Sequence, residues 1–285
     1  MRTLRFKQVD VFTTVPFRGN PVAVVLQGHG LSGEEMQRIA GWTNLSETTF
    51  VLKPTVSGAD YRLRIFTPRD ELPFAGHPTI GSAHALLEAG LVKPREGRFR
   101  QECGAGVLEL TEARGVIEVK APQARVAALD PARIPELERT LRAKVHSSPR
   151  IVSVGPVWLI ADLGAAAAVD ALAPDMAAIG TFTDSIAATG MTVFGATGQP
   201  GAAIHVRSFA PSHGVPEDPV CGSGNISVAA FLRESGQVAR FGAAYRSRQG
   251  MQMGRDGSVS IRIGEDGIHL GGQAVTCVDG SLRVQ

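Results

Sequence analysis

Two short loops of the sequence combine residue types that bind anions and transfer protons. The first contains AGH at 75–77, within ELPFAGHPTIGSA, and the second contains CGSG at 221–224, within EDPVCGSGN. In each loop, glycine and other small residues stand directly before an apolar run that is long enough for a helix. The start of a helix exposes unpaired backbone N–H groups and a positive partial charge, so carboxylates bind there.

These loops predict a site for a small carboxylate substrate. The residues that we expect to bind it are Gly76, Cys221, Gly222, Ser223 and Gly224. The alternative is that the glycines only allow helix and sheet to approach each other closely.

Cys221 is the residue at which thiol chemistry has to be considered. A cysteine at a helix start has a lowered pKa, and two opposed thiols would make a two-base racemase. The position that matches Cys221 in the first loop is Ala75, which carries no proton. The symmetric two-thiol arrangement is therefore broken, and we interpret Cys221 as a small residue in a tight loop. A catalytic role for its thiol stays an alternative.

Three other side chains near the loops can carry protons, and we predict that they are catalytic. His77 lies in the first loop, and Asp218 precedes the second loop where the first copy has Leu72. Glu47 lies in NLSETTFVL, directly before a strand-like segment. If TTF at 48–50 matches TVF at 192–194, Glu47 corresponds to Met191. The alternative for Glu47 is a solvated carboxylate at the start of a strand.

The elements that carry the two loops are repeated along the chain. A strand with alternating side chains is followed by the loop, then by an apolar helix that ends at Gly90 in one copy and Gly236 in the other. At an offset of 143, Arg64, Phe66 and Pro68 match Arg207, Phe209 and Pro211. At an offset of 146, the residues Glu71, Pro73, Gly76, Ile80, Ala83, Leu86 and Gly90 match Glu217, Pro219, Gly222, Ile226, Ala229, Leu232 and Gly236.

This repetition predicts an α+β fold with two pseudo-symmetric domains, 1–123 and 124–285, in which curved sheets enclose central helices at 78–89 and 224–235. An alternative adds the last strand, about 273–285, to the first half. Further strands are expected at 22–26, 48–52, 115–120, 157–163 and 259–263.

Composition excludes several other classes of protein. A net charge of +2 over 285 residues gives no electrostatic footprint for nucleic acid or a membrane surface. No apolar run approaches the ~18 residues of a membrane span, and the first ten residues form no secretory signal. The three widely spaced cysteines form no metal-binding pattern. We therefore expect a cytoplasmic protein with reduced thiols and no metal.

Four segments together resemble the phenazine-biosynthesis PhzF-like isomerases, which are relatives of diaminopimelate epimerase and proline racemase. The segments are DVFTTVPFRGNPVAVV (10–25), NLSETTFVL (44–52), ELPFAGHPTIGSA (71–83) and EDPVCGSGN (217–225). The resemblance covers the whole chain. It implies two halves that each form a barrel-like sheet around a helix, an active site between them, no cofactor and a homodimer.

The resemblance also implies roles for individual residues. Glu47 matches the family's acid/base, which moves a proton along a cyclohexadiene carboxylate, and His77, Asp218 and Ser223 match its other active-site residues. The epimerase relatives carry a thiol in both loops, whereas this chain has one only in the second loop.

The predicted function is a cofactor-independent isomerase that moves a proton on a small carboxylated substrate, of the trans-2,3-dihydro-3-hydroxyanthranilate isomerase type. One alternative is an amino-acid epimerase or racemase that uses Glu47 and Cys221 as its two bases. A second alternative is a non-catalytic protein that binds small carboxylates.

Overall fold

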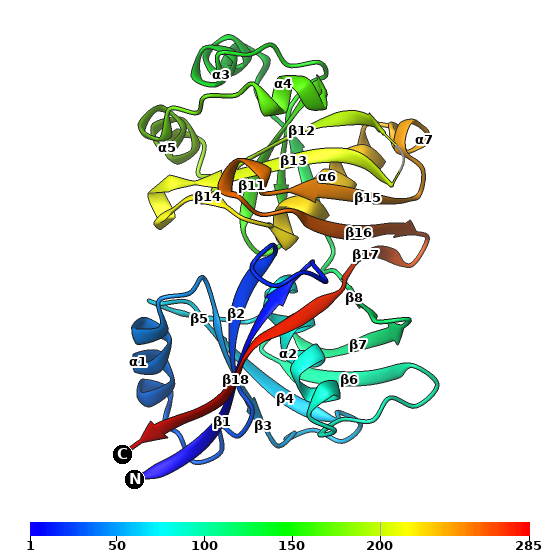
Figure 1. Ribbon diagram of the computed structural model, residues 1–285. Helices are drawn as coiled ribbons and strands as arrows, with labels where there is room; N and C mark the ends of the chain where they lie inside the picture. Colours follow the sequence, from blue (N-terminus) through cyan, green and yellow to red (C-terminus); the bar gives the residue numbers. More distant parts are fainter. Residues whose placement is uncertain (200) are drawn as a thin grey trace. The chain divides into compact units, whose positions relative to one another are not determined.

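The computed structural model describes residues 1–199 and 201–285, and the chain divides into two compact units (Figure 1). The first unit comprises 1–120 together with 271–285, and the second comprises 121–270. The boundary expected at 123/124 thus differs from the observed one by three residues, and the C-terminal strand lies with the first unit.

The first unit is a sheet that wraps around helix α2 (Gly76–Glu88). The order of its long strands is β18-β1-β2-β3-β4-β6-β7-β8, and the short β5 pairs beside β4. Two neighbouring pairs are parallel: β2 with β3, connected through helix α1 (Gly33–Thr43), and β4 with β6, connected through α2. The strands are β1 Arg2–Val11, β2 Asn20–Val25, β3 Thr48–Leu52, β4 Tyr61–Phe66, β5 Glu71–Leu72, β6 Arg98–Cys103, β7 Gly106–Ala113, β8 Val116–Lys120 and β18 Ala274–Val284.

The second unit repeats this connectivity around helix α6 (Gly222–Glu234). Its strand order includes β9-β10-β11-β12-β13-β15-β16, with β14 beside β13, and its parallel pairs are β11 with β12 and β13 with β15. The strands are β9 Arg125–Ala128, β10 Arg150–Ser153, β11 Val157–Ala165, β12 Gly190–Gln199, β13 Ala202–Ala210, β14 Val215–Asp218, β15 Ala244–Gln249 and β16 Gly257–Gly264. Strand β17, Gly267–Gly272, begins in this unit, and its last two residues belong to the first. The other helices are α3 Ile134–Leu141, α4 Ala166–Asp170, α5 Met176–Ser185 and α7 Val238–Phe241.

The expected fold class is confirmed: two pseudo-symmetric α+β units each surround one apolar helix with a curved sheet. Ten of the thirteen residues of α2 are buried, and ten of the thirteen residues of α6 are buried. A helix that is apolar on all sides is stable only when other elements cover it completely, and the sheet supplies that cover. The five additional strands expected from the sequence are also present, as β2, β3, β8, β11 and β16.

Both central helices begin two residues earlier than expected. The sequence places Pro78 at the first helical position, whereas α2 begins at Gly76 after the N-cap Ala75. Proline fits at the third position because the N–H groups of the first turn have no intrahelical partner in any case. Among the described residues, no helix is long and apolar enough to cross a membrane.

Candidate functional site

Glu47 and His77 lie in contact within the first unit. Nε2 of His77 is 3.3 Å from Oε2 of Glu47, and the two side chains are 7% and 14% exposed. The imidazole also bonds to the backbone carbonyl of Pro21. Burial lowers the pKa of His77 to about 3, although the bond to Pro21 acts in the opposite direction. The ring is therefore neutral at physiological pH.

The bond to Pro21 fixes the position of the proton on the imidazole ring. Nε2 of His77 makes no aligned hydrogen bond among the described residues, so the nitrogen that donates to the Pro21 carbonyl is Nδ1. A neutral imidazole has one N–H, which leaves Nε2 as an acceptor. The lone pair of Nε2 thus faces the carboxyl of Glu47, and the contact becomes a hydrogen bond when Glu47 carries a proton.

The backbone around Glu47 is held by α1 on one side and by the sheet on the other. Helix α1 begins with a capping box, in which the side chains of Ser32 and Glu35 each accept a bond from the backbone N–H of the other residue. Its C-cap is Asn44 in the left-handed conformation (φ 53°). The carbonyl of Glu47 then accepts a bond from Ala23 of β2. The backbone of Glu47, the residue directly before β3, is therefore held in place.

The first predicted loop is held by the turn between β6 and β7. The carbonyl of Pro73 accepts a bond of 3.1 Å from the N–H of Ala105. Gly104 packs so closely against this loop that a Cβ there would lie 2.8 Å from Cα of Pro73. The N-cap of α2 is Ala75, whose side chain cannot cap the helix, so the N-cap side chain satisfies none of the backbone N–H groups of the first turn.

Cys221 caps the second central helix with its sulfur atom. Its Sγ accepts a bond of 3.2 Å from the N–H of Gly224 and lies 3.5 Å from Oγ of Ser223. The side chain is buried, and this burial, with the nearby Asp218 carboxylate, raises the pKa of the Cys221 thiol well above its ordinary value. A protonated, buried thiol supports the interpretation of Cys221 as a loop residue.

Asp218 is the titratable group of the second loop. Its Oδ1 accepts a bond of 3.0 Å from the N–H of Val220. Burial raises the pKa of Asp218 to about 6, while the bonds from Cys221 and Val220 act in the opposite direction. Strand register confirms that Leu72 is its counterpart, because Asp218 pairs with Ser208 as Leu72 pairs with Ile65.

Gln249 of β15 fixes the backbone of the second loop, and the sequence analysis missed it. Its Oε1 accepts bonds from the N–H of Cys221 and from Nδ2 of Asn225, both 3.1 Å long, and its Nε2 donates to the carbonyl of Asp218 at 2.9 Å. The side chain is fully buried. The only sequence signal was an uncharged polar residue at the end of an alternating strand, and that pattern is also typical of a solvated strand end.

The correspondence of Glu47 with Met191 is wrong. The register pairs Thr48 with Phe66 in the first unit and Met191 with Phe209 in the second, so Thr48 corresponds to Met191 and Glu47 to Gly190. Aligning TTF with TVF shifts the two strands by one residue relative to the alignment that their pairing in the sheets gives. A glycine therefore stands in the second unit where the first has its carboxylate.

The predicted site residues form two clusters. Gly76 and His77 begin α2, and Glu47 contacts His77; the second unit holds Asp218 with Cys221, Gly222, Ser223 and Gly224 at the start of α6. Within residues 1–199 and 201–285, no group of three or more His, Cys, Asp or Glu side chains converges as a metal site would require.

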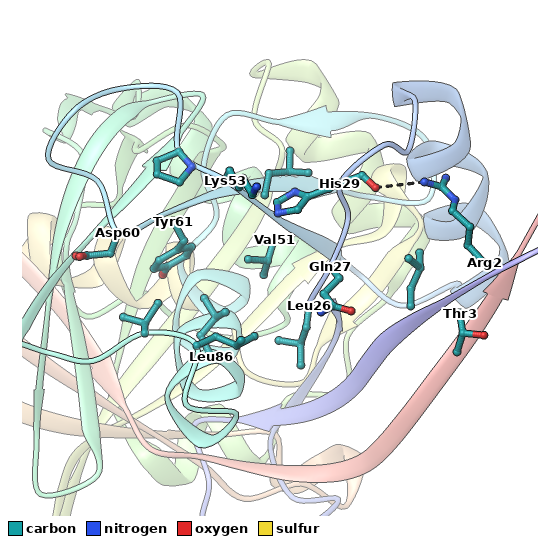
Figure 2. A pocket seen from close by; sticks show the side chains of 15 residues that line it. Arg2, Thr3, Leu26, Gln27, His29, Val51, Lys53, Asp60, Tyr61 and Leu86 are labelled. Carbon is teal, nitrogen blue, oxygen red and sulfur yellow. Dashed lines mark hydrogen bonds between the residues drawn. The ribbon is translucent and has the colours of Figure 1, made fainter.

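A cavity of about 620 Å³ lies elsewhere in the first unit (Figure 2). Figure 2 shows Leu26, Val51 and Leu86 among its apolar lining, together with polar groups such as His29 and Lys53. Neither Glu47 nor His77 lines this cavity.

Comparison with known proteins agrees with this architecture. Residues 9–280 match the family described as Phenazine biosynthesis-like protein. The chain is 41% identical to antisense-enhancing sequence 1 of Schizosaccharomyces pombe, over 96% of this chain and 97% of the relative. It is 36% identical, over 90% of each chain, to the trans-2,3-dihydro-3-hydroxyanthranilate isomerase of Pseudomonas aeruginosa. The crystal structure of a PhzF-family protein from Bacillus anthracis matches with a TM-score of 0.86 and 26% identity over the full length of both chains.

Two repeated halves, each a sheet around a central helix, define the class of diaminopimelate epimerase-like folds. Within this class the chain belongs to the phenazine biosynthesis-like family, PhzC-PhzF, and it is an isomerase. The family resemblance noted in the sequence is thereby confirmed.

Proposed function

We propose that the protein is a cofactor-independent isomerase that moves a proton between two carbon atoms of a small, unsaturated carboxylate. The observation that carries the proposal is the contact between the Glu47 carboxyl and the bare Nε2 of a neutral His77. The named activity of the Pseudomonas aeruginosa relative, isomerisation of trans-2,3-dihydro-3-hydroxyanthranilate, supports this substrate class.

The proposed reaction begins when the Glu47 carboxylate takes a proton from an acidic C–H bond of the substrate. The C–H electron pair moves into the conjugated system, and the new carboxyl O–H donates to Nε2 of His77. The Glu47 carboxyl exchanges its proton with solvent and then gives a proton to another carbon of that system, which breaks the O–H bond and forms the new C–H bond. No electrons are gained or lost overall, so the reaction needs neither an oxidant nor a reductant.

Backbone N–H groups of both predicted loops would hold the negative charge of the substrate. We assign this role to Gly76 and to Cys221, Gly222, Ser223 and Gly224. Fixed donors aimed at developing charge commonly make the largest single contribution to catalysis. Asp218 would orient a polar substituent, such as an amine.

The observations favour an isomerase over a Cys221-based epimerase. The Cys221 sulfur accepts from Gly224, and burial keeps its thiol protonated. An epimerase would need a thiolate at this position to remove a proton. A non-catalytic binding protein would have no use for the paired Glu47 and His77, although only an exchange experiment separates binding from turnover.

The test is proton exchange in heavy water with trans-2,3-dihydro-3-hydroxyanthranilate and, in parallel, a panel of amino acids. We expect the wild-type protein to introduce deuterium into the former and Glu47→Gln to introduce none above background. Exchange by Glu47→Gln at the wild-type rate would overturn the role of Glu47. Tight binding without exchange by the wild type would support the binding-protein alternative, and exchange at an amino-acid α-carbon would support the epimerase.

We also propose that the protein acts as a homodimer in the cytoplasm. The support for both statements is membership of the PhzC-PhzF family. Light scattering at micromolar concentration would show a mass of twice 30.0 kDa, and a mass of one chain would contradict the dimer.

A further inference from the structure

We propose that Trp158 is a positioning residue that makes Ser223 a hydrogen-bond donor toward the carboxylate of the substrate. The inference rests on the proposed function, because it assigns a donor to the same anion-binding loop. Trp158 is the second residue of β11, and its side chain is buried. Its indole Nε1–H donates to Oγ of Ser223 over 3.0 Å.

The indole N–H of Trp158 makes the Ser223 hydroxyl oxygen an acceptor and leaves the hydroxyl proton for another bond. An indole N–H can only donate, whereas a hydroxyl has one donor and two acceptor positions. Once Oγ of Ser223 accepts from Trp158, its own proton is free to point at another acceptor. One such atom in the second unit is Sγ of Cys221 at 3.5 Å, which is a weak acceptor and already receives the Gly224 N–H. A carboxylate oxygen is a much stronger acceptor for this proton.

The room for the indole exists because the strand beside it carries a glycine. Trp158 and Gly190 are register partners on the parallel strands β11 and β12. A Cβ at Gly190 would lie 2.7 Å from Cζ3 of Trp158 and 2.3 Å from the carbonyl oxygen of Phe209. No side chain larger than hydrogen therefore fits at the position that corresponds to Glu47.

The position that holds Glu47 in the first unit and Gly190 in the second is thus used differently in the two units. Ser223 follows the first glycine of α6 as His77 follows the first glycine of α2. The first unit places the Glu47 carboxyl against His77, and the second unit places the Trp158 indole against Ser223. In this proposal one unit provides a group that takes up a proton, and the other provides a hydroxyl whose own proton is left for another acceptor.

The first test measures the binding of anthranilate and of its neutral counterpart 2-aminobenzamide to Trp158→Phe, Ser223→Ala and the double variant. Phenylalanine keeps an aromatic ring but removes the N–H. We expect each single variant to weaken anthranilate binding by about 3- to 10-fold, the range for one net hydrogen bond. The double variant should be no weaker than Ser223→Ala, and 2-aminobenzamide should discriminate little among them. Additive losses, or equal losses for both ligands, would overturn the proposal.

A second measurement does not depend on the folding of Trp158→Phe. The chain has two tryptophans, so ¹⁵N-labelled protein gives two indole signals, and the exposed Trp42 is an internal control. Anthranilate should shift the Trp158 signal and leave the Trp42 signal in place, and Ser223→Ala should abolish the shift. An unmoved Trp158 signal at saturating anthranilate would overturn the proposal. Neither readout involves turnover, so both stay interpretable if the exchange experiment with Glu47→Gln contradicts the isomerase.

Discussion

Nε2 of His77 faces the Glu47 carboxyl at 3.3 Å with a lone pair, because the single proton of the neutral ring is held by the Pro21 carbonyl. Such a pair is suited to the state in which Glu47 has just taken a proton, since only then does a hydrogen bond connect the two side chains. His77 would therefore stabilise the protonated form of the base rather than act as an acid itself. Its low pKa keeps this arrangement unchanged across the physiological range.

Glu47→Gln should abolish the movement of the proton while leaving the contact surface intact. Glutamine keeps the shape of glutamate and can donate its amide N–H to Nε2 of His77, but it cannot accept a substrate proton. Turnover should fall by at least about 10²- to 10⁴-fold, the usual contribution of a general base, whereas anthranilate affinity should change little. Steady-state kinetics and calorimetry check the two halves of this expectation, and wild-type turnover in the variant would contradict it.

The stability of the second unit should depend on pH through Asp218. Its folded pKa of about 6 lies above the ordinary value of 3.8, so the folded state keeps a proton that the unfolded chain has released. The stability associated with this proton is complete below about pH 3.8 and is lost as the pH rises through 6. Asp218→Asn removes this loss, so we expect a higher Tm than that of the wild type at pH 8.

The same variant separates stability from function. Thermal unfolding between pH 4 and 8 should show a smaller difference from wild type at the acidic end than at the alkaline end. Activity should fall in spite of the higher Tm, and the limb of the wild-type kcat/KM profile near pH 6 should disappear. A Tm difference that is independent of pH would contradict the assignment.

Gln249→Leu should weaken catalysis through the second loop. The change removes three hydrogen bonds and leaves the Cys221 N–H and the Asp218 carbonyl without their partner, which costs about 1–3 kcal/mol for each unsatisfied buried group. Because the loop then loses its fixed conformation, kcat/KM should fall more than the loss of folded protein explains.

Gln101→Leu provides the control for this prediction. Gln101 is an equally buried glutamine of the first unit, but its bonds go to the side chains of Tyr61 and Thr79 rather than to a loop backbone. Gln101→Leu should lower the Tm by about as much as Gln249→Leu does, but it should reduce kcat/KM less. Equal effects of the two substitutions on kcat/KM would show that Gln249 acts only through stability.

The sequence was sufficient for the fold because the repeated pattern is long and each copy contains a largely apolar helix between strands. It also indicated Glu47, His77 and the residues of the second loop as candidates, since these lie within short distinctive segments; their roles stay predictions. It could not reveal Trp158 or Gln249, whose roles depend on strand register. The mistaken match of Glu47 with Met191 has the same origin. The similar letters of TTF and TVF suggested one alignment, whereas the pairing of the strands requires another.

Cys221→Ser should retain most of the activity. Serine is a favoured N-cap residue, so its hydroxyl can take over the bond that Sγ accepts from the Gly224 N–H, and kcat/KM should fall by less than about tenfold. The buried wild-type thiol should also react with iodoacetamide more slowly than Cys277, which is only partly buried. Mass spectrometry of the alkylated peptides and kinetics of the variant check both points. A loss of about 10³-fold or more in turnover would instead indicate that the thiol transfers a proton, and the epimerase alternative would then replace the isomerase.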